Sequence, residues 1–171
     1  MPGGTKKSRA PKLETSGMAP DLLDTVPAQV KDVMYRLGPK ATQQEAKRIL
    51  TYQTQYPGGT IPELLTLDWL RLNQYPHEYQ VELYGGRRVA GGLVPDFIVD
   101  AGPMPWVWQI DGDYWHSAAF DLGTKDAAAD MRYMASQYRG RQIGGVVHLK
   151  ESDILRLRPW VFLQAVAGIG I

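Results

Sequence analysis

Residues 94–111 read VPDFIVDAGPMPWVWQID, and this stretch decides the fold. It holds two short runs rich in Val, Ile, Phe and Trp, which are separated by Ala101-Gly102-Pro103. Runs of this composition, bounded by Gly and Pro, are typical of β-strands. We therefore predict strands over 94–99 and 106–110, joined by a turn at 101–103.

The chain before these strands is mainly helical. We expect a short helix over 27–38, and a second over 42–53 with Thr42 and Glu45 as a capping box. These two form a helical hairpin. A third helix, capped by Thr60, is expected over 60–72, and alternating apolar and polar residues over 78–83 predict a half-buried strand.

The chain after residue 111 completes the sheet. We predict a helix over 125–138, an apolar strand over 144–149 and a last short helix over 151–155, with 160–166 packing the C-terminus. A helix between two strands of one sheet makes those strands parallel. The predicted fold class is α/β, a small mixed β-sheet flanked by helices with an N-terminal helical hairpin. We divide the chain into a disordered basic tail over 1–25, a hairpin extension over 26–56 and a main domain over 57–171.

The composition excludes several classes of protein. The 171 residues include no Cys, which excludes disulfides, thiolate metal sites and Cys nucleophiles. No apolar run approaches a membrane span, and the first 20 residues lack the apolar core of a signal peptide, so we expect a cytoplasmic protein with no membrane partner. A formal net charge of +1 argues against binding nucleic acid through a broad basic surface.

The charge is unevenly distributed along the chain. The first 20 residues carry a net charge of +3, which leaves −2 for the rest. Between residues 96 and 130, Lys125 is the one basic residue against seven aspartates: Asp96, Asp100, Asp111, Asp113, Asp121, Asp126 and Asp130. Such a cluster is either a solvated acidic face or a site for a divalent cation, since Mg²⁺ prefers oxygen ligands.

Two of these aspartates lie at strand ends. Asp96 begins one predicted strand and Asp111 follows the next, where Gln109 and Asp111 share a face. On adjacent strands, Asp96 and Asp111 can approach within metal-bridging distance, although aspartates at such places also cap turns.

A histidine follows the second strand. His116 lies five residues after Asp111, where it could be a general base, a metal ligand or a structural residue. Asp126 and Asp130 lie four residues apart on one face of the next helix, and either could orient His116. Asp126 could equally interact with the helix dipole.

The segments IPELLTLDWL, YQVELYGGRRVAGGLVPDFIVD, VWQIDGDYWHS, TKDAAADMRYM and VVHLKESDIL carry a family resemblance. In this order they resemble the very-short-patch-repair endonucleases, the EDxHD branch of the PD-(D/E)XK nuclease superfamily, in its phage and homing-endonuclease type. The resemblance covers about residues 60–155 and makes 57–171 a nuclease domain with a restriction-endonuclease-like core.

The resemblance implies a metal-dependent DNA endonuclease that nicks one strand or cuts both, with Mg²⁺ as cofactor, Mn²⁺ as a substitute and no organic cofactor. It implies these roles: Glu63, Asp96, His116 and Asp126 in catalysis; Asp96, Asp111 and the Ile110 carbonyl on the metal; Gln109 and Asp130 as alternates. The sequence departs from the family pattern in two respects. Gln109-Ile110-Asp111 lacks the usual Lys of the (D/E)XK strand, and Asp130 competes with Asp126 for the final role.

Double-stranded DNA is the partner that the resemblance implies. Arg87, Arg88 and Lys125 are the expected phosphate contacts, although Arg87-Arg88 can also be a solvated hairpin tip. We expect a monomer in the cytoplasm of a bacterium or of a phage-infected host cell. Two alternatives remain: a non-catalytic DNA-binding or virion-associated protein that keeps the nuclease fold, and a Holliday-junction resolvase, which would favour dimers and a basic channel.

Overall fold

A computed structural model describes residues 25–112 and 122–170, with the backbone alone for 122–126. The elements follow in this order: α2 (Ala28–Leu37), α3 (Gln43–Gln55), α4 (Ile61–Leu72), β1 (His77–Tyr79), the 3-10 turn η1 (Gly86–Arg88), β2 (Phe97–Val99), β3 (Trp106–Asp111), α6 (Leu122–Met134), β4 (Gln137–Tyr138), β5 (Arg141–Gln142), β6 (Val146–Lys150), α7 (Glu151–Leu157) and α8 (Trp160–Gly168). No helix within these ranges is long and apolar enough to cross a membrane.

The main sheet has four strands in the order β1-β2-β3-β6. β1 pairs with β2 and β2 with β3 in antiparallel fashion, whereas β3 and β6 are parallel. The crossover through α6 joins the parallel pair, as the order of predicted elements requires. The predicted α/β class with a small mixed sheet is therefore confirmed.

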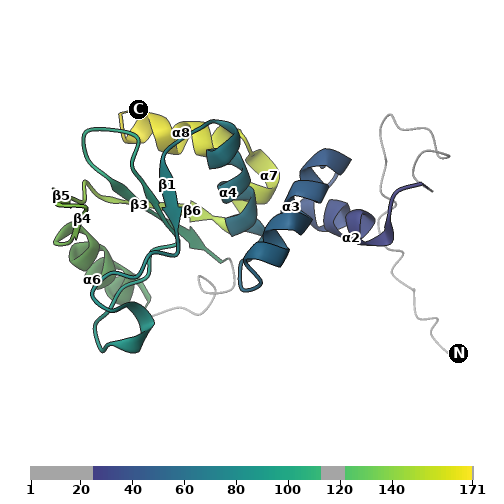
Figure 1. The fold of residues 1–171 in the computed structure, drawn as a ribbon. Helices are drawn as coiled ribbons and strands as arrows, with labels where there is room; N and C mark the ends of the chain where they lie inside the picture. Colours follow the sequence, from purple (N-terminus) through teal and green to yellow (C-terminus); the bar gives the residue numbers. More distant parts are fainter. Residues whose placement is uncertain (1–24, 113–121, 171) are drawn as a thin grey trace, which may run out of the picture.

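Helices cover both faces of this sheet (Figure 1). Phe97, Val99 and Trp108 point to the face where α4, α7 and α8 pack, and all three are fully buried there. Their neighbours Ile98 and Val107 point to the other face, where they form a second core with Tyr133 of α6 and the nearby Tyr138 and Ile143. The alternation of side chains along a strand thus builds two cores, one on each side.

Three predicted boundaries were wrong. The strand expected over 78–83 ends at Tyr79, because Gln80 has a φ of 52° and turns the chain out of the extended conformation. β2 begins at Phe97 rather than at 94, since the Asp96 N–H donates to the Gln109 side chain and not to a strand backbone. The helix expected over 125–138 spans 122–134, and β4 follows it because Arg139 and Gly140, both with positive φ, form a tight turn into β5.

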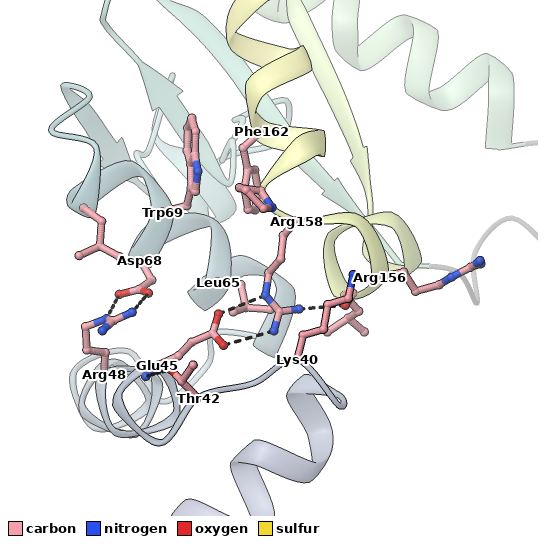
Figure 2. A pocket seen from close by; sticks show the side chains of 13 residues that line it. Lys40, Thr42, Glu45, Arg48, Leu65, Asp68, Trp69, Arg156, Arg158 and Phe162 are labelled. Atoms are coloured by element: carbon pink, nitrogen blue, oxygen red, sulfur yellow. Dashed lines mark hydrogen bonds and ion pairs between the residues drawn. The ribbon is translucent and has the colours of Figure 1, made fainter. Parts of the chain in front are cut away.

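The N-terminal hairpin is fixed to the main body by two arginines. Arg48 of α3 binds both carboxylate oxygens of Asp68 on α4, at 2.7 and 2.9 Å. Arg158, between α7 and α8, binds Glu45 at 3.1 Å and the Leu37 carbonyl at 3.1 Å. Figure 2 shows the Arg48–Asp68 and Arg158–Glu45 pairs in the wall of a pocket of about 300 Å³. The two acids that line this pocket, Asp68 and Glu45, are already paired with Arg48 and Arg158. We therefore regard the pocket as a seam, a gap between packed helices, and not as a ligand site.

Candidate functional site

Asp96 lies where β2 begins, one residue before the Phe97–Trp108 pair of the β2–β3 ladder. Its Oδ2 accepts a hydrogen bond from the Ile110 N–H at 2.7 Å. Its own N–H donates to Oε1 of Gln109 at 3.3 Å. The Asp96 carboxylate is therefore held against the end of β3, beside the residue that was predicted to offer a metal-binding carbonyl.

The electrostatic environment of Asp96 is unfavourable for its negative charge. Burial raises the pKa of Asp96 from the ordinary 3.8 to about 6. The Ile110 N–H opposes this shift, the carboxylates of Glu63 and Asp111 add to it, and the Arg87 guanidinium opposes it. Three carboxylates thus repel one another at this end of the sheet, which is a field that a divalent cation would neutralise.

Glu63 is held by bonds from two sides. It forms a capping box with Thr60, in which the Thr60 N–H donates to Glu63 Oε2 at 3.3 Å. The Tyr79 hydroxyl donates to the same oxygen and accepts from the Gln80 side chain. Burial and this bond to Glu63 raise the pKa of Tyr79 well above its usual range. The predicted catalytic Glu63 therefore caps α4 and is fixed in place by a tyrosine from β1.

His148 belongs to the site, although we had predicted only an apolar strand there. Its Nδ1 lies 2.9 Å from Oδ2 of Asp111, and its Nε2 lies 3.1 and 3.0 Å from the two oxygens of Asp130. Both ring nitrogens face carboxylate oxygens, an arrangement that favours the doubly protonated imidazolium form of His148. The bond to Asp111 and then that to Asp130 raise the pKa of His148 to about 9, against the effect of burial.

This histidine connects three elements that are distant in the sequence. His148 on β6 is the register partner of Gln109 on β3, and Asp130 comes from α6. The structure therefore brings Asp130 to His148. His116 lies outside the described residues, as do the side chains of Asp126 and Lys125. The predicted partnership of His116 with Asp126 stays a prediction.

The donor set fits a hard cation. Within the described part of the chain, no three His, Cys, Asp or Glu side chains form a ready-made metal site. Mg²⁺ usually takes one or two carboxylates and keeps several waters. Asp96, Asp111 and the Ile110 carbonyl supply that number of protein oxygens at the end of β3. Gln109, the alternate, is already used: its Nε2 donates to the Tyr133 hydroxyl at 2.7 Å and its Oε1 accepts from Asp96.

The two predicted DNA-binding arginines lie in the turn η1. Arg87 and Arg88 are both exposed there, and Arg87 is close enough to lower the pKa of Asp96. A cation therefore lies beside the acidic cluster.

No family model, no curated protein and no solved structure matches this chain. What the site can do is therefore argued from its own residues.

Proposed function

We propose that this protein is a metal-dependent DNA endonuclease that hydrolyses phosphodiester bonds in double-stranded DNA. One observation carries the proposal: the buried carboxylate of Asp96 is crowded by Glu63 and Asp111 at the end of β3, with Arg87 beside it. An enzyme that binds a divalent cation and a phosphate needs adjacent acidic and basic groups of this kind.

Each residue has a role in this proposal. Asp96, Asp111 and the Ile110 carbonyl would hold Mg²⁺ or Mn²⁺, and the bound ion would polarise the scissile phosphate. His148 orients Asp111 through its 2.9 Å bond, and Tyr79 orients Glu63. Arg87 contacts a phosphate oxygen next to the scissile bond. The resemblance adds His116 as the base that activates water, with Asp126 orienting it.

The element order supports the proposal. A helix carrying Glu63 is followed by three antiparallel strands, a crossover helix and a parallel strand. This order is compatible with the restriction-endonuclease-like core that the resemblance to very-short-patch-repair enzymes implies.

The proposal is tested on supercoiled plasmid DNA incubated with Mg²⁺, with Mn²⁺ or with EDTA. We expect nicking that requires the metal and is lost in Asp96→Asn and in His116→Ala. Asp100→Asn is the matched control, because Asp100 follows β2, pairs with Arg141 and takes no part in the proposed site. Cleavage that persists in EDTA, or that survives Asp96→Asn, would contradict the proposal.

A second candidate is a DNA-binding protein that keeps the fold without cleaving DNA. The strand Gln109-Ile110-Asp111 favours it, because this strand lacks the superfamily's usual catalytic Lys, and Gln109 is engaged with Tyr133 and Asp96. In the plasmid assay this candidate binds DNA and leaves it intact with every divalent metal.

A further inference from the structure

The segment of residues 84–92, which we name the arginine loop, joins the end of the β1 region to β2. Its ends are closed by Leu83 and Leu93, whose backbones exchange two hydrogen bonds of 2.8 and 2.9 Å. Inside, Gly92 packs against Gly86 so closely that a Cβ on Gly92 would lie 1.9 Å from the Gly86 carbonyl oxygen. The backbone of the loop is therefore closed at its two ends and closely packed where Gly86 meets Gly92.

Tyr84 occupies an unusual position at the start of this loop. Its φ is 52°, in the left-handed region that aromatic residues rarely adopt, and its side chain is 62% exposed. The unfavourable backbone conformation is not offset by burial of the ring, so core packing does not explain a tyrosine here. An exposed ring on a closed loop is suited to contact another molecule.

The same loop and the helix beside it carry three arginines. Arg87 and Arg88 are exposed on η1, and neither has a hydrogen bond or an ion pair to any residue that the structure describes. Arg132 of α6 adds a third guanidinium, since its Nη2 lies 3.4 Å from where a Cβ on Gly91 would be. Arg87 also acts on Asp96, so this basic surface borders the proposed cleavage site.

We infer that the arginine loop binds a nucleic-acid strand by stacking Tyr84 on an accessible base while Arg87, Arg88 and Arg132 contact phosphates. This inference deepens the proposed function, on which it rests for the choice of DNA as ligand. Aromatic side chains stack on any base whose face is open, and guanidinium groups bind the backbone on either side. A base inside an intact duplex has both faces covered, so the loop selects DNA with an unstacked base, such as a single-stranded gap.

Binding is measured by fluorescence anisotropy in EDTA, with an intact duplex and with the same duplex carrying a short central gap. We expect the wild-type protein to prefer the gapped DNA. Tyr84→Asn keeps a residue that tolerates left-handed backbone and removes the ring. It should weaken binding to gapped DNA by about 5- to 150-fold with an unchanged salt dependence. Tyr84→Phe should bind like the wild type, and Arg88→Ala or Arg132→Ala should each reduce the salt slope by about one.

Tyr35→Asn is the matched control, because Tyr35 on α2 is also exposed, at 71%, and lies outside the loop. A 2-aminopurine placed in the gap should be quenched by the wild-type protein and by Tyr84→Phe but not by Tyr84→Asn. Equal affinity of wild type and Tyr84→Asn for gapped DNA would overturn the inference. If the two proteins bind equally but the wild type still cleaves plasmid DNA with a metal, the inference about the loop fails and the nuclease proposal stands. If binding depends on Tyr84 but no metal supports cleavage, the inference about the loop stands and the nuclease proposal fails.

Discussion

Replacing Asp96 with Asn should stabilise the folded protein at neutral pH. The wild-type carboxylate is penalised first by burial and then by Glu63 and Asp111, and these effects raise its pKa to about 6. An Asn side chain has no charge to desolvate, and its Oδ1 can still accept the 2.7 Å bond from the Ile110 N–H. The substitution thus removes the unfavourable term and keeps the hydrogen bond.

The size of the gain follows from the two pKa values of Asp96. The difference between 3.8 in the unfolded chain and about 6 in the folded one corresponds to about 3 kcal/mol, at ~1.4 kcal/mol per pKa unit. The carboxylate keeps partial contact with water, so we expect a gain of about 1–3 kcal/mol at pH 8, or roughly 3–10 °C in melting temperature for a chain of this size.

The sign of the pH dependence is also determined. Since the folded pKa of Asp96 is raised, the penalty is absent below pH 3.8 and grows as pH rises through about 6. The difference in unfolding free energy between Asp96→Asn and the wild type should therefore reach its full value at pH 8 and nearly vanish at pH 4. Urea denaturation at both values measures it. The matched Asp100→Asn variant should lose stability, because it breaks the ion pair with Arg141. A destabilised Asp96→Asn, or a difference independent of pH, would refute this account of the site.

Two further predictions concern the ion pairs of His148 and of Arg158. His148→Gln should lower the free energy of unfolding by about 1–2 kcal/mol, a figure already reduced because the His148 side chain is about one-third exposed to solvent. Because Asp111 and Asp130 raise the pKa of His148, that contribution is full below pH 6.5 and lost as pH rises through about 9; wild-type and variant unfolding free energies should converge there in urea titrations. Arg158→Met should cost about 3–5 kcal/mol, since it leaves Glu45 unpaired in the seam, whereas Arg156→Met, which removes an exposed cation with no ion pair among the described residues, should change the melting temperature little.

Local signals in the sequence predicted most of the fold. The Thr42 hydroxyl accepts from the Glu45 N–H at 3.1 Å, which is one half of the predicted capping box, whereas the Glu45 carboxylate pairs with Arg158. The helices over 43–55 and 61–72 begin where their caps indicate. The parallel pairing of β3 and β6 followed from the helix between them. Such features depend on residues close together in the chain, where pattern and geometry are tightly linked.

Features that depend on distant contacts or on unusual backbone angles could not be predicted in this way. The alternation of apolar and polar residues over 78–83 does not indicate the positive φ of Gln80 that ends β1. The two-residue strands β4 and β5 are too short for a periodic signal. The part of His148 in the site depends on the register that sets it opposite Gln109, 39 residues earlier, and on the position of Asp130 across α6.

The register of β3 and β6 explains how the fold offsets part of the negative charge at this end of the sheet. Asp111 and Asp130 share the His148 ring, at 2.9 and 3.0 Å, and its imidazolium form offsets one of their two negative charges. Within the described part of the chain, the Asp96 carboxylate accepts a bond from a neutral group, the Ile110 N–H, and the exposed Arg87 of the arginine loop is a cation that acts on it. A bound cation would offset the repulsion that Glu63 and Asp111 exert on the Asp96 carboxylate, so Mg²⁺ should raise the melting temperature of the wild type and not of Asp96→Asn.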